Sequence, residues 1–365
     1  MKISLLQQDL LPILQTVSRS VGVRSTLPVL DNILLSTDGS KLKIAATNLE
    51  IGVIKSIPIE VIEPGEVTVP AKTILEIVSS LKQASIEIVS QGEILEIKSG
   101  NFQAKINGIS SNEFPVIPQS EGVGVTFPTK ILSSVSQILF AGAVDEGRPV
   151  LTGILVQSTN GLLDFVATDG FRLAHRQIKL DKGETNFKSL IPKRTLEEVV
   201  KIISEEDIEE VTMNTSPNQN QIVFNIGQVI LSSRLIEGNF PAWEKIIPQE
   251  ITTRIIVDKD EILKATKLAT IFSKAEGFVV FKIGEGKLVL SSAAKELGSQ
   301  ENEVDGTIEG QDLEVAINGK FLVDALSNSP ATQIMVEFSG SLTPLLIKSV
   351  GVEGLEYVIM PVRVS

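Results

Sequence analysis

Hydrophobic residues recur with helical spacing in some segments of the chain and with every-second-residue spacing in others. Near the N-terminus, Leu10, Ile13, Leu14 and Val17 have the spacing of the apolar face of an α-helix. A short apolar strand, Lys2–Leu6, precedes this helix. The segments that follow alternate apolar and polar residues between turn residues such as Asp-Gly, which is typical of antiparallel strands. The pattern therefore predicts an α+β fold with antiparallel sheets.

The same order of elements recurs along the chain. The segment Val29–Ile59 aligns without a gap with Val150–Leu180, at an offset of 121 residues. Further on, "VPAKTILEIV" matches "IPKRTLEEVV", and a fainter third copy begins at Gly277. A period of about 120 residues is too long for a solenoid and indicates homologous domains. We expect three tandem domains, 1–120, 121–248 and 249–365, each with two helices and about eight antiparallel strands.

The expected helices are more basic than the rest of the chain. Six are predicted, at residues 7–24, 71–82, 128–142, 193–203, 258–275 and 318–329. Together they carry more lysine and arginine than aspartate and glutamate, although the whole chain has a formal net charge of −12. Net charge alone argues against binding nucleic acid. If the basic helices share one surface, that surface could still face DNA phosphates. Alternatively, the basic residues simply lie on ordinary helix faces exposed to solvent.

Composition excludes several kinds of site. The chain has no cysteine and one histidine, which excludes disulfides, thiol nucleophiles and metal sites built from several histidines. Gln7, Gln8 and Asp9 interrupt the apolar run that a signal peptide requires. Apolar stretches long enough to span a membrane are absent from the sequence. We expect a cytoplasmic protein without metal or cofactor.

One stretch, "DFVATDGFRLAHRQ" at Asp164–Gln177, resembles a catalytic loop at first sight. An enzyme interpretation would combine Asp169, Arg172 and His175. No catalytic triad, paired carboxylate motif or glycine-rich phosphate loop accompanies them. Thr-Asp-Gly is explained more simply as a turn at the end of a strand. We therefore expect no catalytic residues, and an exposed or half-buried strand position for His175.

Several motifs together resemble a known family. They are "VRSTLPVLDNILL", "VATDGFRLA", "GNFPAWEKIIP" and the terminal "YVIMPVRVS". With the three tandem domains, they are similar to the bacterial DNA polymerase III beta subunits, the processivity sliding clamps, over the whole chain. The resemblance implies a head-to-tail homodimeric ring that encircles duplex DNA without reading its sequence. It also implies that the ring tethers the DNA polymerase III catalytic subunit, the clamp loader and other proteins that carry a clamp-binding motif. A monomeric three-domain scaffold that binds only proteins is the alternative.

The resemblance assigns the opening stretch to one wall of a peptide-binding pocket. The apolar floor and the few polar groups of such a pocket suit a short peptide. Phe171 departs from the family, in which histidine is common at this position, so the pocket would lose a donor and gain an apolar wall. The implied pocket residues are Leu151, Thr168, Gly170, Phe171, Arg172, Leu173, Pro241, Lys245, Ile246, Val358 and Met360.

The resemblance also implies DNA contacts and a dimer interface. Arg24 and Arg148 fall in the matches to the DNA-touching loops, and the helix cations are candidates as a group. These are Arg19, Lys72, Lys82, Lys130, Lys193, Arg194, Lys201, Lys264, Lys267 and Lys274. The implied interface residues are Lys72, Ala104 and Ile106 on one side, and Ile271 and Phe272 on the other.

Overall fold

The computed structural model describes residues 1–22, 27–82, 85–120, 124–145, 147–180, 186–216, 220–273, 278–294 and 298–363. The chain forms two compact units. The first contains Met1–Leu132 and Glu198–Leu235, and the second contains Ser133–Glu197 and Ile236–Ser365. Both units therefore combine residues from more than one of the predicted domains, whose boundaries stay a prediction.

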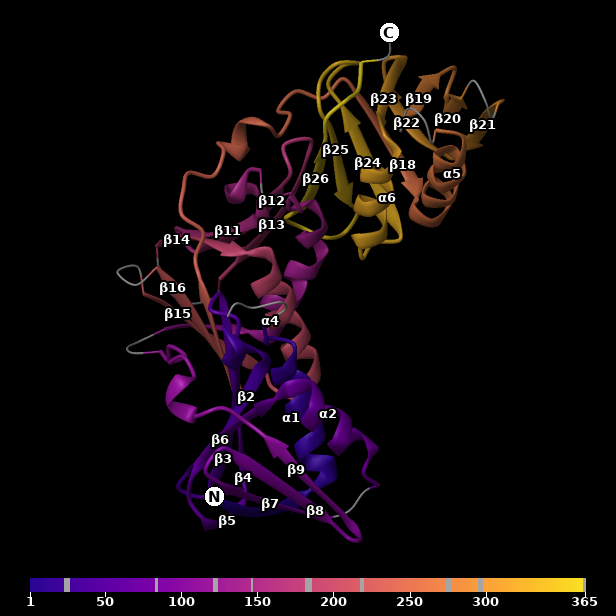
Figure 1. Ribbon diagram of the computed structural model, residues 1–365. Helices are drawn as coiled ribbons and strands as arrows, with labels where there is room; N and C mark the ends of the chain where they lie inside the picture. The colour runs from indigo at the N-terminus through magenta and orange to yellow at the C-terminus, as the bar shows by residue number, and fades with distance from the viewer. Residues whose placement is uncertain are drawn as a thin grey trace. The chain divides into compact units, whose positions relative to one another are not determined.

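The first unit contains a five-stranded and an eight-stranded sheet, both antiparallel (Figure 1). The five-stranded sheet has the order β5-β1-β7-β8-β9, and the eight-stranded sheet has the order β10-β15-β16-β17-β4-β3-β2-β6. The elements from the first part of the chain are β1 (Lys2–Leu6), α1 (Gln7–Ser18), β2 (Asn32–Asp38), β3 (Lys41–Thr47), β4 (Ile51–Pro58), β5 (Glu60–Glu63), β6 (Glu66–Pro70), α2 (Ala71–Ser80), β7 (Ser85–Gln91), β8 (Ile94–Ser99), β9 (Phe102–Asn107) and β10 (Val125–Pro128). Those from the later part are β15 (Glu210–Ser216), β16 (Gln221–Ile226) and β17 (Val229–Arg234).

The second unit contains a nine-stranded and a four-stranded antiparallel sheet. Their orders are β14-β11-β12-β13-β26-β25-β24-β18-β22 and β21-β20-β19-β23. The earlier elements are β11 (Gly153–Thr159), β12 (Leu162–Thr168), β13 (Arg172–Lys179) and β14 (Phe187–Pro192). The later elements are β18 (Thr253–Asp258), α5 (Lys259–Phe272), β19 (Phe278–Gly284), β20 (Lys287–Ala294), β21 (Gly298–Val304), β22 (Gly306–Gly310), β23 (Leu313–Asn318), α6 (Gly319–Asn328), β24 (Gln333–Phe338), β25 (Leu345–Ser349) and β26 (Leu355–Ile359).

Most predicted elements are confirmed. In α1, the four apolar residues that set the helical period are all buried. At the start of α5, the Asp258 carboxylate accepts hydrogen bonds from the amides of Asp260 and Glu261, which caps the helix. The helix α4 (Lys193–Glu205) runs from the second unit into the first. The α+β fold with antiparallel sheets is therefore confirmed.

The helix predicted over residues 128–142 is wrong as a single helix. It is replaced by a short helix, α3 (Thr129–Ser133), and two turns of 3₁₀-helix, η3 (Ser134–Gln137) and η4 (Leu139–Ala141). Three serines interrupt the apolar pattern here, and the Ser136 hydroxyl donates to the carbonyl oxygen of Ser133 (2.8 Å). Such side-chain bonds compete with the helical backbone ladder.

The internal repeat is visible in the strands. The bounds of β2, β3 and the start of β4 recur in β11, β12 and β13 at the 121-residue offset. In the first unit Gly52 of β4 pairs with Ser232 of β17, and in the second Leu173 of β13 pairs with Val358 of β26. Among the described residues, no helix is long and apolar enough to span a membrane.

Candidate functional site

The polar corner after β12 is a hydrogen-bonded turn. The Thr168 hydroxyl donates to the carbonyl oxygen of Arg172 (2.6 Å) and accepts from the amide of Gly170 (3.0 Å). One Asp169 carboxylate oxygen accepts from the amides of Phe171 (2.9 Å) and Arg172 (3.0 Å). Gly170 has a φ of 92°, a conformation that favours glycine. Asp169 and its neighbours therefore shape the backbone, as the turn interpretation predicts.

A small apolar cavity lies against this turn. The C-terminal segment reaches it through β26, because the amide of Met360 donates to the carbonyl oxygen of Phe171 (2.9 Å). The cavity volume is about 10 Å³, which is room for roughly one water molecule. Phe171 stands at its mouth with 65% of its surface exposed. The lining residues are Thr168, Gly170, Phe171, Arg172, Leu173, Ile246, Val358 and Met360.

Three of the predicted pocket residues do not line this cavity. Leu151 is buried close to Gly170, since a Cβ on that glycine would lie 3.9 Å from the Leu151 Cδ1. Pro241 and Lys245 are exposed on the segment that carries Ile246. The cavity is therefore lined by fewer residues than the predicted pocket.

The floor of the cavity belongs to a hydrophobic cluster. Leu173 and Val358 pack in this cluster with Phe240 and Trp243, and Ile246 lies against it. Trp243 belongs to a 3₁₀-helix, η7 (Trp243–Lys245), so the packing of its ring positions Ile246 at the cavity wall. The sequence motif "GNFPAWEKIIP" contains both aromatic residues, but its spacing did not indicate their supporting role.

Arg172 lines the cavity, but its guanidinium is already bound by other groups of the protein. Its guanidinium donates to the carboxylates of Asp169 (2.9 Å) and Asp324 (2.6 Å) and to the carbonyl oxygen of Phe140 (2.9 Å). It also lies over the ring of Phe321, 4.5 Å from the ring centre. These contacts connect the turn to α6, and they leave the guanidinium occupied.

His175 is buried, so the expectation of an exposed or half-buried residue is wrong. Its Nε2 lies 2.8 Å from an Asp164 carboxylate oxygen, and its Nδ1 lies 3.6 Å from Glu356. Its ring packs on Trp243, with the two ring centres 4.4 Å apart. Burial by itself would lower the pKa of His175, but the hydrogen bond with Asp164 and the nearby carboxylate of Glu356 outweigh this effect and raise it.

This histidine belongs to a row of charges of alternating sign that crosses the nine-stranded sheet. Glu337, only 2% exposed, accepts from Arg254 (2.7 Å) and lies 2.9 Å from the Lys348 amine. Burial would raise the pKa of Glu337, but the bonds from Lys348 and Arg254 lower it. The row consists of Asp164 on β12, His175 on β13, Glu356 on β26, Lys348 on β25, Glu337 on β24 and Arg254 on β18.

Most of the candidate DNA-binding cations are exposed on helices. Arg24 and Lys274 lie outside the described residues. Lys72 pairs loosely with Glu76 (3.9 Å), and Lys193 with Glu197 (4.0 Å). The remaining exposed cations form no ion pair within the described part of the chain, namely Lys82, Lys130, Arg194, Lys201, Lys264 and Lys267.

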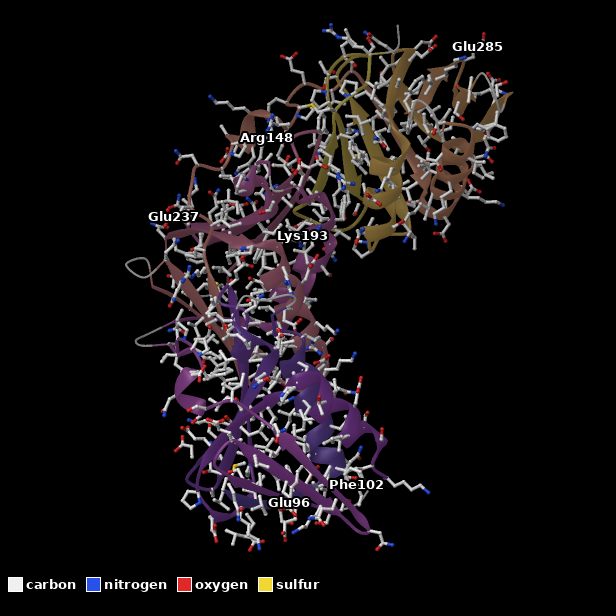
Figure 2. All side chains as sticks on the ribbon, viewed as in Figure 1. Glu96, Phe102, Arg148, Lys193, Glu237 and Glu285 are labelled. Atoms are coloured by element: carbon white, nitrogen blue, oxygen red, sulfur yellow. The ribbon has the colours of Figure 1, made fainter. Side chains whose placement is uncertain are left out.

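Two of the candidate arginines have other surroundings. Arg19 donates to Glu198 (2.6 Å) and binds Glu205 through both terminal nitrogens (2.9 and 3.0 Å). Burial opposes its charge, yet the hydrogen bonds to Glu205 and Glu198 raise its pKa. Arg148, labelled in Figure 2, lies beside the cavity turn, because a Cβ on Gly170 would be 3.6 Å from its Nη1.

The predicted interface residues differ in their exposure. Ile271 on α5 is 52% exposed, and Phe272 beside it is half-buried. Ile106 on β9 is buried and Ala104 half-buried, whereas Phe102 on the same strand is exposed. Within the described residues, β9 forms one edge of its sheet, with Phe102 at its start (Figure 2). The family resemblance did not single out Phe102.

The described residues also include no group of three or more histidine, cysteine, aspartate or glutamate side chains arranged to hold a metal ion. The candidate functional features of the described residues are therefore a small apolar cavity, a set of basic helix residues and an exposed sheet edge.

Comparisons with known proteins give one consistent result. Three family models match in order, the N-terminal, central and C-terminal domains of the DNA polymerase III beta subunit, at residues 1–118, 126–242 and 244–363. The predicted fold class of three tandem clamp domains is confirmed by these matches. The chain is 31% identical to the beta sliding clamp of Bacillus subtilis, and the match covers 100% of both chains. It is 30% identical to the beta sliding clamp of Synechocystis sp., and this match covers 100% of the chain and 99% of the relative.

Solved structures agree with the sequence matches. One is the crystal structure of a DnaN sliding clamp from Pseudomonas aeruginosa bound to griselimycin, at a TM-score of 0.95 and 28% identity. Another is the DNA polymerase sliding clamp from Bacillus subtilis, at a TM-score of 0.95 and 29% identity. Both comparisons cover 100% of each chain. The chain therefore belongs to the DNA polymerase III beta subunit family, the bacterial sliding clamps.

Proposed function

We infer that this protein is a sliding clamp that encircles duplex DNA and tethers the replicative polymerase, which gives the polymerase processivity. The observation that carries this conclusion is the match of all three beta-subunit domains, in order, along the whole chain. We propose domain boundaries at 1–120, 121–248 and 249–365, which the matched ranges support. The protein acts without catalysing a reaction, and we place it in the cytoplasm with the DNA that it serves.

We propose that the cavity beside the Thr168–Arg172 turn binds short peptides of partner proteins, including the DNA polymerase III catalytic subunit and the clamp loader. Apolar side chains of Leu173, Ile246 and Val358 offer a floor for one or two apolar anchors, which carry most of the energy in such interfaces. Since the cavity now holds only about 10 Å³, a peptide must displace the side chains that fill it. Met360 and the exposed Phe171 are the candidates for movement.

We propose that the exposed helix cations approach DNA phosphates. Such contacts carry no sequence information, and they weaken as the salt concentration rises, because binding releases counterions from the DNA. Two copies of the chain would close the ring through the exposed edge at β9 of one copy and the α5 end of the other. Ile106 would contribute through its backbone, because its side chain is buried, and Phe102 would supply an apolar side chain.

Retention on DNA tests encirclement directly. The clamp is loaded by a clamp loader onto a nicked circular plasmid and onto the same plasmid after linearisation. A ring should remain on the circular plasmid and slide off the ends of the linear form. A protein that binds only through surface contacts should dissociate from both forms at the same rate. The mass in solution separates the ring from the monomeric scaffold, which would run at the 39.4 kDa of one chain.

The pocket is tested by Met360→Asp, which places a charge among apolar side chains. Binding of a fluorescein-labelled clamp-binding peptide should fall at least about 30-fold, since a central anchor contributes roughly 2 kcal/mol or more. Glu285, exposed in a turn between β19 and β20 and labelled in Figure 2, offers the matched control Glu285→Gln. Equal binding by both variants would exclude this cavity as the peptide site.

A further inference from the structure

The first unit repeats the polar turn of the cavity. The Thr47 hydroxyl donates to the carbonyl oxygen of Ile51 (3.0 Å) and accepts from the amide of Leu49 (3.0 Å). The Asn48 side-chain oxygen accepts from the amides of Glu50 (3.0 Å) and Ile51 (2.8 Å). These are the bonds that Thr168 and Asp169 make in the second unit, with an asparagine in place of the aspartate.

The neighbouring strand also takes the same position. The amide of Arg234 donates to the carbonyl oxygen of Glu50 (3.0 Å), as the amide of Met360 donates to Phe171 (2.9 Å). The 121-residue offset relates Glu50 to Phe171, and the strand pairing relates Arg234 to Met360. The backbone of the cavity is therefore built twice in this chain.

The side chains around the second copy are different, and they leave a larger cavity. Gly52 stands where the other cavity has Leu173, and Ser232 stands where it has Val358. The resulting cavity has a volume of about 100 Å³, against about 10 Å³ beside Thr168. Ligand and cofactor sites commonly measure roughly 300 Å³ or more, so this volume suits a single side chain of a larger partner.

The mouth of this cavity combines an apolar rim with free charges. Val116 is 94% exposed and Leu49 is 45% exposed, and both line the cavity. Leu49 has a φ of 73°, which residues other than glycine rarely adopt, and its counterpart in the other turn is Gly170. Across the described residues, the side chains of Arg234 and Glu50 have no ion-pair partner, although both line the cavity.

We propose that this cavity is a second protein-binding site, which takes an extended segment of another protein with an aliphatic side chain next to an acidic one. The aliphatic side chain would enter between Leu49 and Val116. The acidic side chain would meet Arg234, whose planar guanidinium matches a carboxylate in geometry and charge. The Glu50 carboxylate would accept a hydrogen bond from a backbone amide of the bound segment. The proposal does not depend on peptide binding at the cavity beside Thr168.

Three fluorescein-labelled decapeptides test this preference on the intact protein. Each has one leucine in an alanine and serine background, followed by two aspartates, two lysines or two serines. Fluorescence anisotropy measures affinity, and methyl NMR of leucine- and valine-labelled protein locates the bound peptide. The aspartate peptide should bind most tightly and should shift the methyl resonances of Leu49 and Val116.

Variants separate the two cavities. Arg234→Glu should weaken the aspartate peptide at least about tenfold, as expected for the loss of a hydrogen bond between charged groups, and should favour the lysine peptide instead. Leu49→Gly, which copies the glycine of the other turn, should weaken all three peptides by removing an apolar wall. Met360→Asp should leave binding of the aspartate peptide within about twofold, because it alters only the cavity beside Thr168.

Several results would overturn the proposal. They are equal affinity for the three peptides, no binding at millimolar concentration, or shifts confined to methyl groups beside Thr168, such as those of Val358. Loss of the aspartate peptide in Met360→Asp but not in Arg234→Glu would also overturn it. Thermal melting of each variant checks the fold, and Arg234→Lys, which keeps the charge, should retain most of the binding if the cation is what the segment recognises.

Discussion

The buried pair of His175 and Asp164 predicts an unusual pH dependence for the second unit. The pKa of His175 is raised in the folded protein above its ordinary value of 6.5. The folded state therefore holds a proton that the unfolded state releases as the pH rises past 6.5. The stability that this proton provides is fully present below that pH and is lost as the pH rises through the folded pKa.

The magnitude follows from the contacts. While the histidine is protonated only in the folded state, the free energy of unfolding falls by up to about 1.4 kcal/mol per pH unit. The Nε2 to carboxylate distance of 2.8 Å, with both side chains buried, supports a charge-assisted bond of about 2 kcal/mol. His175→Gln keeps a donor toward Asp164 but cannot titrate. Its cost should be largest below pH 6.5 and should shrink as the pH rises through the folded pKa of His175.

Urea unfolding at a series of pH values measures this effect. Trp243, the single tryptophan in the chain, lies against His175 and reports on the second unit through its fluorescence. The chain has one histidine and no cysteine, so few other groups titrate in this range. The pKa values of Asp164 and Glu356 are lowered, and the stability that they provide is lost only as the pH falls through those values. A wild-type stability that is flat or rises from about pH 6 to 9, or an identical slope in His175→Gln, would refute the reasoning.

Three further predictions concern the proposed clamp activity. Phe272→Asp should convert the dimer to a monomer in sedimentation experiments. The new carboxylate would be buried in the interface without a partner, which costs roughly several kcal/mol. A dimer that persists at low concentration would exclude this interface. Lys201→Ala should shorten retention on circular DNA of any sequence, whereas Arg19→Ala should chiefly lower the melting temperature, because its guanidinium is bound to Glu198 and Glu205. Phe171→His should shift the preference among partner peptides by about 1 kcal/mol in anisotropy measurements, the typical worth of one hydrogen bond; unchanged preferences would show that this side chain does not touch the peptide.

Local patterns in the sequence predicted most of the strands and the long helices. The strand Lys2–Leu6 appears with the predicted bounds, and the alternating segments that follow it include β2, β3 and β4. These elements follow from alternation and turn residues, which act over a few positions. The helix over 128–142 failed for the same reason, because its apolar spacing is helical while its serines favour local side-chain bonds.

Contacts between distant residues could not be predicted in this way. His175 is buried because Glu356 lies on the strand paired with its own and Trp243 covers its ring. Neither residue is near it in the sequence, and nothing in "FRLAHRQ" indicates either contact. The same holds for Arg172, whose ion pair with Asp324 depends on α6 packing below the turn. Resemblance to a family identified the cavity residues, but only the packing of Trp243 and Phe240 explains why Ile246 reaches it.

The two copies of the turn separate what determines its shape from what determines its chemistry. The shape is local, because Thr47 with Asn48 and Thr168 with Asp169 form the same bonds within a few residues of sequence. The chemistry comes from the strand that pairs beside each turn, which brings Ser232 to one cavity and Val358 to the other. A change in that strand can therefore alter what the cavity accepts without disturbing the turn. This is why one repeat can provide a small apolar cavity in the second unit and a larger cavity with charged residues in the first.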